Sequence, residues 1–163
     1  MSRVLSDTTI AELLSERKVL PSGFRAALAL KAVNRNERAD LEIVGDAGGR
    51  FCLMRRRAEL NQFDFSVILG YQFSDTNALM LLRRYNGKSH EHRNSLERGP
   101  LFYDYHIHTA TERYQLAPGY KPEHFAEITA RYADLKGALQ CTFEDCHFVV
   151  PDDPQTILFG DKP

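Results

Sequence analysis

The sequence predicts a single α+β domain over residues 1–163, with an N-terminal helix, an antiparallel sheet and C-terminal helices packed on one face of the sheet. Three observations support this fold class. The chain has 163 residues, of which 43% are hydrophobic, and this suits one core. Its middle alternates between apolar and polar residues, and its last third changes to helical spacing. The expected parts are a helix in 1–20, a meander sheet of five to seven strands in 24–110, helices in 120–147 and an extended tail in 148–163.

The N-terminal helix is predicted from a cap and an apolar stripe. Ser6 or Asp7 can cap it, and it should run to about Lys18. Pro21-Ser22-Gly23 then ends it. The stripe at helical spacing consists of Ile10, Leu13 and Leu14.

The clearest strand runs from Phe63 to Phe73, where aromatic and aliphatic residues occupy every second position. Alternation with period two is typical of a half-buried strand. Short polar turns separate it from the other predicted strands, so the strands should form an antiparallel meander. These other strands are 25–33, 41–44, 51–57 and 78–85, with turns at 34–38, 45–49 and 74–77.

After residue 120 the spacing predicts two helices. Pro122 suits a first helical position, and Phe125, Ile128 and Tyr132 then recur on a narrow stripe. Asp134 can cap the second helix. The apolar face of that helix would comprise Leu135, Leu139 and Phe143.

Charge is distributed unevenly along the chain, although the formal net charge is −1. Residues 50–98 carry an excess of four basic side chains, and residues 99–163 carry an excess of five acidic ones. The basic segment could bind nucleic acid, and the acidic segment could bind a protein partner. The alternative is that the two segments neutralise each other within the fold.

The cysteines and the absence of a long apolar run predict a cytoplasmic protein with no membrane partner. Cys52, Cys141 and Cys146 are odd in number, which does not suit a disulfide framework. No stretch resembles a signal peptide or a membrane span. Cys141 and Cys146 lack the spacing of a zinc knuckle, so we interpret them as small buried thiols.

Two His-x-His pairs are the main functional signal. His90 and His92 follow Asn86-Gly87, a dipeptide that predicts a tight hairpin with Lys88–Arg93 as its returning arm. A second pair would lie on a strand over 101–108. Alternation on that strand places Asp104, His106 and His108 on one face and Leu101, Tyr103, Tyr105 and Ile107 on the other.

The two pairs converge if Gly99-Pro100 closes a second hairpin. In that register His92 would face His106 and His90 would face His108, with Cβ atoms about 5 Å apart. A slip of one residue would separate the pairs onto opposite faces. Mutual repulsion in such a cluster would depress the pKa values of the imidazoles, so the fold should weaken below about pH 6.

Our first functional hypothesis is metal-independent acid–base chemistry on RNA or another phosphodiester. Histidine can both take and give a proton near neutral pH. His106 and His108 would be acid and base, His90 or His92 would assist, and Asp104 would orient an imidazole. The residues predicted to bind substrate phosphates or bases are Arg84, Lys88, Arg93, Arg113, Tyr103 and Tyr105.

Three other interpretations remain open at this point. His90, His92, His106 and His108 could bind a transition metal such as zinc. The positive charges of neighbouring Arg84 and Lys88, however, disfavour the binding of a metal ion. The same surface could bind nucleic acid or protein without chemistry, as an inhibitor or adaptor does. Finally, the histidines could decorate an exposed sheet, with Asp104 and Glu112 as ion-pair partners.

Three stretches together resemble an uncharacterised family of small bacterial proteins, known as a domain of unknown function. They are "RYNGKSHEHRN", "FYDYHIHTATERYQ" and "GALQCTFEDCHF", and the resemblance covers about residues 50–148. It implies a product of a mobile element, or of a defence or toxin–antitoxin locus. It implies no established activity and no catalytic residue. With the histidine pairs, it suggests a small cytosolic bacterial protein of the toxin or defence type.

Overall fold

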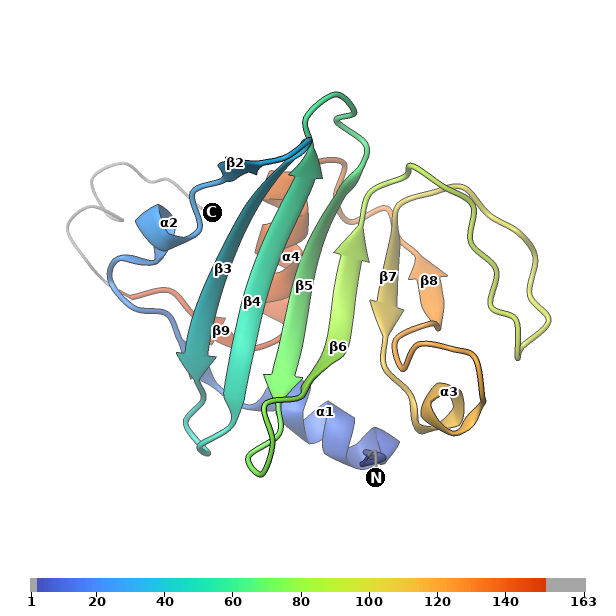
Figure 1. Ribbon diagram of the computed structural model, residues 1–163, viewed down its shortest axis with the longest axis horizontal. Coiled ribbons are helices and arrows are strands. Elements are labelled where there is room, and N and C mark those ends of the chain that lie inside the picture. Colours follow the sequence, from blue (N-terminus) through green and yellow to red (C-terminus); the bar gives the residue numbers. More distant parts are fainter. Residues whose placement is uncertain (1–2, 152–163) are drawn as a thin grey trace.

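The computed structural model describes residues 3–151 and confirms an α+β fold with an antiparallel sheet (Figure 1). Within these residues seven strands pair in chain order, β2 to β8, and all neighbours are antiparallel. The sheet is therefore the predicted meander. Its strands are β2 (Lys31–Val33), β3 (Asn36–Val44), β4 (Arg50–Ala58), β5 (Phe65–Gln72), β6 (Leu79–Asn86), β7 (His106–Thr109) and β8 (Ala126–Ile128).

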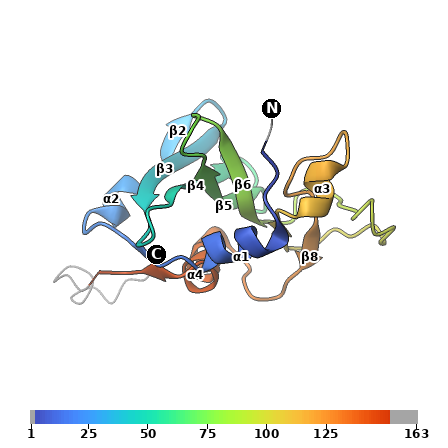
Figure 2. The same cartoon turned by 90° about the horizontal axis from the view of Figure 1, so that it is seen from below.

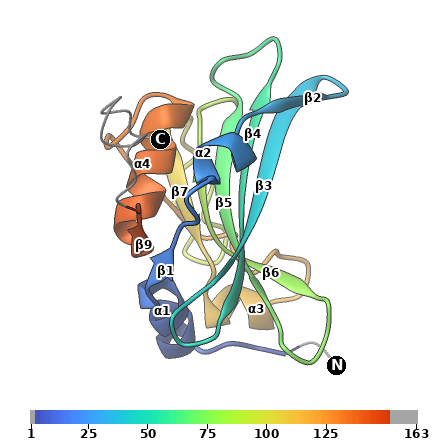
Figure 3. The same ribbon diagram turned by 90° about the vertical axis from the view of Figure 1, so that its left-hand side faces the viewer.

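Helical and extended segments cover one face of this sheet. Over β3 to β5, the other face of the sheet is left open (Figures 2 and 3). The covering elements are α1 (Asp7–Ser15), α4 (Leu135–Asp145) and a parallel strand pair, β1 (Lys18–Val19) with β9 (Phe148–Val149). The core lies between the two layers. There Phe65, Val67 and Leu69 of β5 are buried in the same apolar cluster as Ala138 and Leu139 of α4.

Helix α4 forms where the sequence predicts it. The side chain of Asp134 accepts a hydrogen bond from the main-chain nitrogen of Gly137 at 2.7 Å, which caps the first turn. Its buried face includes Leu135, Leu139 and Phe143. No helix in the described part of the chain is long and apolar enough to cross a membrane.

Helix α1 is capped by Ser6 but ends at Ser15, before the predicted end at Lys18. Lys18 is fully buried in β1, and its Nζ donates to the carbonyls of Leu13, Leu14, Glu16 and Cys146 at 2.8 to 3.1 Å. These carbonyls include the unpaired ones at the end of α1. Burial lowers the pKa of the Lys18 ammonium group to about 8. One lysine therefore binds the end of α1 and ties it to the C-cap residue of α4.

The predicted strand 25–33 is wrong over its first half. Phe24–Ala27 form a short helix, α2, and the strand begins at Lys31. Phe24 and Leu28, four residues apart, are both buried, and this spacing suits a helical turn. The predicted turn 34–38 is shorter than expected. Asn34 has a φ of 58°, and β3 already begins at Asn36.

The predicted helix after Pro122 is also wrong. Ala126–Ile128 form the edge strand β8, with His108 opposite Ala126 and His106 opposite Ile128. Pairing with β7 outweighs a narrow apolar stripe, because sheet hydrogen bonds satisfy the main chain there. The predicted tail 148–163 contains β9 at its start, and residues 152–163 lie outside the described part of the chain.

The buried hydroxyl of Tyr132 joins the ends of β6 and β7. It lies 2.7 Å from the carbonyl oxygen of Asn86 and 3.0 Å from that of His106, and it shares its proton between the two. Asn86 is the last residue of β6 and His106 is the first of β7. The hydroxyl thus clamps both ends of the long connection 87–105.

We expect Tyr132→Phe to lower the free energy of unfolding by about 1–3 kcal/mol, because two buried carbonyls lose a donor. Urea denaturation would measure the loss. Tyr103→Phe is the matched control. Tyr103 is 54% exposed, so its variant should stay within about 0.5 kcal/mol of the parent protein. Equal stability of the two variants would contradict the role of the clamp.

Candidate functional site

The tight hairpin predicted at Asn86-Gly87 does not form, and Lys88–Arg93 do not return as a strand. β6 pairs with β7 instead, so Asn86 lies opposite His106. Gly87 is required for another reason. A Cβ atom on it would lie 2.0 Å from the carbonyl oxygen of Phe63, so only glycine allows this close approach of two main chains.

The connection 87–105 folds back on itself in a register different from the predicted one. The main chains of His92 and Phe102 exchange two hydrogen bonds of 2.9 Å, so His92 opposes Phe102 and not His106. The chain bends at Asp104, and β7 therefore starts at His106, later than expected. As a result Leu101 and Tyr103 are exposed and do not join the core face.

The four predicted imidazoles nevertheless come together. His106 and His108 lie on the same face of β7, with ring centroids 4.9 Å apart. The His92 ring stacks on His106 at 5.6 Å and meets His108 at 4.9 Å. The exposed His90 ring lies 5.7 Å from His106. The imidazoles therefore converge because the connection 87–105 folds back on itself, and not because residues 86–93 form the predicted hairpin.

A fifth imidazole, His124, was missed by the sequence interpretation. Its ring centroid lies 4.9 Å from that of His92, and it precedes β8 by two residues. The sequence interpretation placed His124 in a helix at 122–132, so it was not assigned to the site. The available signal was the alternation of His124, Ala126 and Ile128, which is typical of a strand. We refer to His90, His92, His106, His108 and His124 as the histidine cluster.

Main-chain acceptors assign the tautomers of the two innermost imidazoles. His106 Nδ1 lies 2.7 Å from the Asp104 carbonyl oxygen, and His108 Nδ1 lies 3.2 Å from that of His124. A carbonyl oxygen can only accept, so each Nδ1 carries a proton and each Nε2 keeps its lone pair. His108 Nε2 is buried without a hydrogen-bond partner among the described residues. Asp104 orients His106, but it does so through its main chain, because its side chain is exposed.

The side chain of Asn94 fixes His92 and covers the sheet edge at β8. Its amide nitrogen donates to the Ala126 carbonyl at 2.7 Å, and its oxygen accepts from the Ala126 nitrogen at 2.9 Å. These two bonds identify the oxygen, which also accepts from His92 Nε2 at 3.0 Å. The proton of His92 is therefore on Nε2, and the lone pair is on Nδ1.

Burial keeps the inner imidazoles neutral. It lowers the pKa of His106 to about 4, and it also lowers the pKa values of His92 and His108. Repulsion among the cluster and from Arg84 acts in the same direction, but loss of hydration is the largest cause. The predicted direction is therefore correct, whereas repulsion, the predicted cause, comes second.

Of the predicted basic residues, Arg84 lies at the histidine cluster, whereas Lys88 lies beside Tyr105, which packs against the core. Arg84 pairs across the strands with His108, and its guanidinium is 3.8 Å from the buried carboxylate of Glu123. Lys88 lies over the rings of Phe63 and Tyr105, with its Nζ 5.6 and 5.3 Å from the ring centroids.

The other predicted substrate residues are placed less favourably. Arg113 binds the Glu97 carboxylate and the Leu96 carbonyl, and exposed Arg93 contributes a carbonyl oxygen to His124. Tyr105 packs against the core and donates its hydroxyl to the Ala133 carbonyl. Tyr103 is free to stack on a base, since it is 54% exposed.

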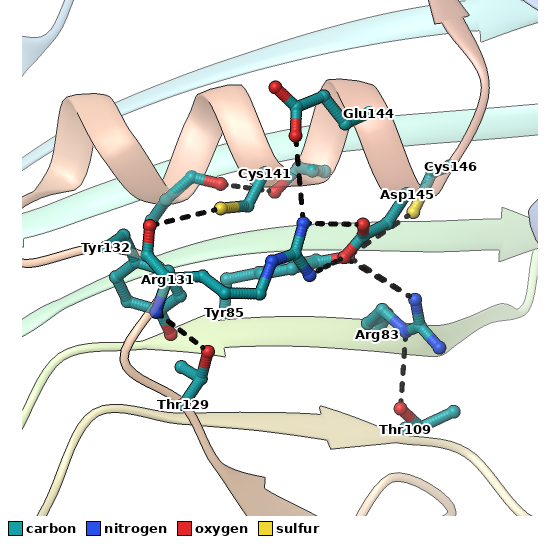
Figure 4. Close-up of polar contacts among 12 residues, drawn as sticks. Arg83, Tyr85, Thr109, Thr129, Arg131, Tyr132, Cys141, Glu144, Asp145 and Cys146 are labelled. Carbon is teal, nitrogen blue, oxygen red and sulfur yellow. Dashed lines mark hydrogen bonds and ion pairs between the residues drawn. The ribbon is translucent and has the colours of Figure 1, made fainter.

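Arg83, next to Arg84 in the sequence, belongs to the opposite face of the sheet. It bonds to Thr109 at 3.2 Å and lies 3.9 Å from Asp145 of α4. Figure 4 shows Arg131 meeting the same carboxylate, with two hydrogen bonds of 2.8 Å. The Tyr85 hydroxyl donates to it as well. This network joins the sheet to α4. It also neutralises the charge of Arg83, which is therefore not available to bind a ligand.

A metal would have to use the free nitrogens of the cluster. On the three buried imidazoles these are His92 Nδ1, His106 Nε2 and His108 Nε2, of which His106 Nε2 has a long contact of 3.5 Å with the Asn86 amide. Within residues 3–151, no group of three or more His, Cys, Asp or Glu side chains is arranged to hold an ion.

Comparison with known proteins finds no relative. No protein-family model matches the chain, and neither does any curated protein or solved structure. The resemblance of residues 50–148 to an uncharacterised bacterial family therefore stays a prediction.

The depressed histidine pKa values predict a loss of stability in acid. Below the ordinary histidine pKa of about 6.5, the unfolded chain takes up protons that the folded chain refuses, so the free energy of unfolding falls with pH. His106 alone should cost about 2 kcal/mol between pH 7 and pH 5. Urea denaturation at both pH values would measure it.

The comparison should use His106→Gln, which removes this titration, and His147→Asn as a control outside the cluster. His147 has a φ of 59°, which asparagine tolerates. We expect the pH dependence to shrink in His106→Gln and to persist in His147→Asn. A parent protein equally stable at pH 7 and pH 5 would refute the neutral cluster.

Asn94→Asp should loosen the connection 87–105, because a carboxylate cannot donate to the Ala126 carbonyl. We expect a loss of about 1–3 kcal/mol in unfolding free energy, together with faster hydrogen exchange at the amides of His92 and Phe102. Asn77→Asp, in an exposed turn, should change neither quantity. Unchanged exchange in Asn94→Asp would contradict its role as an anchor.

Proposed function

We propose that this chain is a metal-independent ribonuclease of the toxin or defence type, which cleaves single-stranded RNA at the histidine cluster. The observation that carries the proposal is the free Nδ1 of His92, on a neutral imidazole near exposed His90 and the Arg84 guanidinium. RNA is the preferred phosphodiester because its 2′-hydroxyl supplies a nucleophile without a metal ion. The toxin or defence role comes from the sequence resemblance.

In the proposed reaction His92 is the base and His90 is the acid. His92 Nδ1 takes the proton of the 2′-hydroxyl, whose oxygen attacks the adjacent phosphorus. Protonated His90 gives its proton to the departing 5′-oxygen. A 2′,3′-cyclic phosphate and a free 5′-hydroxyl result. Arg84 stabilises the negative charge that develops on the phosphoryl oxygens.

Burial supports this division of roles over the one expected from sequence. His106 and His108 are 0% and 2% exposed, so a polymer reaches them poorly, whereas His90 is exposed and His92 keeps 9% of its surface accessible. His106 contacts both rings, at 5.7 and 5.6 Å, and so acts as a positioning residue between them. His108 and His124 support His92 from the other side.

A polar row across the sheet supports the choice of a polymer, with Ser66, Asn86 and His106 buried at one end and Arg38 exposed at the other. Cross-strand pairing aligns one residue from each of five neighbouring strands, and the row leads to the cluster. Arg38 at its start is exposed, so it can contact phosphates over a distance from the cleavage site. The members of the row are Arg38, Arg56, Ser66, Asn86 and His106.

The test is cleavage of labelled single-stranded RNA in the presence of EDTA. His90→Gln should reduce the rate by at least about 100-fold, because loss of a general acid costs this much. His147→Asn should cleave as the parent protein does. Arg38→Ala should cleave more slowly at moderate salt, with less effect on the rate at saturating RNA.

Two results would contradict the proposal. One is a parent protein that leaves RNA intact under these conditions. The other is equal cleavage by the His90→Gln and His147→Asn variants. Exposed His90 can be replaced without disturbing the core, so circular dichroism should confirm an unchanged fold before the comparison.

A metal site at the same nitrogens is the second candidate. The observation in its favour is that His92 Nδ1, His106 Nε2 and His108 Nε2 keep lone pairs on rings whose centroids lie 4.9 to 5.6 Å apart, so small side-chain rotations would be needed to bring them onto one ion. Elemental analysis of untagged protein would decide. About one equivalent of a transition metal, lost in His106→Gln and kept in His147→Asn, would favour this candidate over the metal-independent enzyme.

A further inference from the structure

A cavity of about 710 Å³ lies beside the first half of β6, and its wall contains no member of the histidine cluster. Figure 2 shows the N-terminal segment, which forms one wall, lying between β6 and α3 (Glu112–Leu116). The turn between β5 and β6 and the loop that follows α3 form the others. This volume is typical of a small-molecule site. Apolar residues of the wall include Val4, Phe73, Leu79, Met80 and Leu81.

The Gln115 side chain fixes the N-terminal wall of the cavity. Its oxygen accepts from the Leu5 nitrogen at 2.8 Å. Its amide nitrogen donates to the carbonyl oxygens of Leu5 and Thr111 at 2.9 and 3.0 Å. The wall is therefore a built feature of the fold, and both amide hydrogens of Gln115 are in use within the protein.

The acidic side chains in the wall have basic neighbours, which leaves one cation in excess. Asp75 pairs with Arg3 at 2.7 Å. Glu123 is 2% exposed, and its buried Oε2 faces the Arg84 guanidinium at 3.8 Å, so that oxygen is closed to a ligand. Lys121 also lines the cavity and is exposed, and its ammonium group forms no ion pair or hydrogen bond with residues 3–151. The charge that the wall offers to a ligand is therefore positive.

Two hydroxyl groups add free donors to the wall. Tyr120, next to Lys121 in the sequence, is half-buried, and its hydroxyl forms no hydrogen bond within the described part of the chain. The Thr76 hydroxyl accepts from the Ala78 nitrogen at 3.1 Å, so its own hydrogen is still available. An ammonium group and hydroxyl donors beside an apolar wall suit an anion with an apolar body.

We propose that this cavity binds a small organic carboxylate, with its apolar body against the apolar wall and its carboxylate on Lys121 and Tyr120. The two oxygens of a carboxylate suit an ammonium group and a neighbouring hydroxyl as donors. The apolar wall selects a hydrocarbon or aromatic body of modest size. The site needs none of the cluster histidines, so it stands apart from the proposed ribonuclease activity.

Three probes of similar shape test the chemistry on the parent protein: 3-phenylpropionate, 3-phenylpropanamide and 3-phenylpropylamine. NMR titration should show saturable shifts at the methyl groups of Leu79 and Leu81. We expect the carboxylate to bind about 10-fold more tightly than the neutral amide, and the amine to bind more weakly than both. Absence of saturable shifts at these methyl groups, or equal affinities for the three probes, would overturn the proposal.

Replacement of the excess cation tests its role directly. Lys121→Met should weaken binding of the carboxylate by about 10-fold and leave the amide unchanged, because methionine keeps an apolar stem without the charge. Lys31→Met is the matched control, since exposed Lys31 lies on β2 at the other edge of the sheet. Equal affinity of the two variants for the carboxylate would contradict the proposal.

Two further variants test the hydroxyl and the apolar wall. Tyr120→Phe keeps the ring, whose centroid lies 5.0 Å from that of His124, and should weaken binding of the carboxylate by about 5-fold. Leu79→Trp adds bulk at a wall residue that is 43% exposed, and it should reduce binding of both the carboxylate and the amide. Unchanged carboxylate affinity in either variant would refute the site.

Discussion

The pairing of β6 with β7, held at one end by the Tyr132 hydroxyl, is the constraint on which the site depends. It sets Asn86 opposite His106 and Arg84 opposite His108, so the cation and both imidazoles share one face of the sheet. It also fixes the two ends of the connection 87–105. Asn94 then anchors the middle of that connection to β8, which brings His92 onto the same imidazoles.

Neutrality of the inner histidines is the energetic consequence of this arrangement. Main-chain carbonyls hold each Nδ1 proton of His106 and His108, and burial excludes a second proton from their rings. The cluster thus keeps unprotonated nitrogens beside the guanidinium of Arg84. A site of this kind can accept a proton from a substrate hydroxyl, which is the step that a metal-free ribonuclease needs.

Strands with clear alternation were predictable from sequence, and the site was predictable in part. The alternation of Phe65, Val67 and Leu69 predicted β5, and the capping residue Asp134 predicted α4. Both predictions were possible because each depends on neighbouring residues in the sequence. The bend at Asp104, the edge strand at Ala126 and the contribution of His124 arise from pairing between distant segments, which period and propensity do not encode. The prediction that the histidines converge was correct, but the strand register from which it was derived was wrong. Strand parity placed His106 and His108 on one face correctly. His92, however, reaches them through a turn at residues 95–98 that pairs it with Phe102, and not through the predicted hairpin that would pair it with His106.

The central claim is that the cluster uses the 2′-hydroxyl of RNA without a metal ion. The most direct measurement is analysis of the cleavage products of two strands of one sequence, all-ribose and 2′-O-methyl, in EDTA. The account predicts a 2′,3′-cyclic phosphate from the ribose strand and no cleavage of the methylated strand. Cleavage of both strands, with a 5′-phosphate on the products, would contradict it, because water and not the sugar hydroxyl would then be the nucleophile.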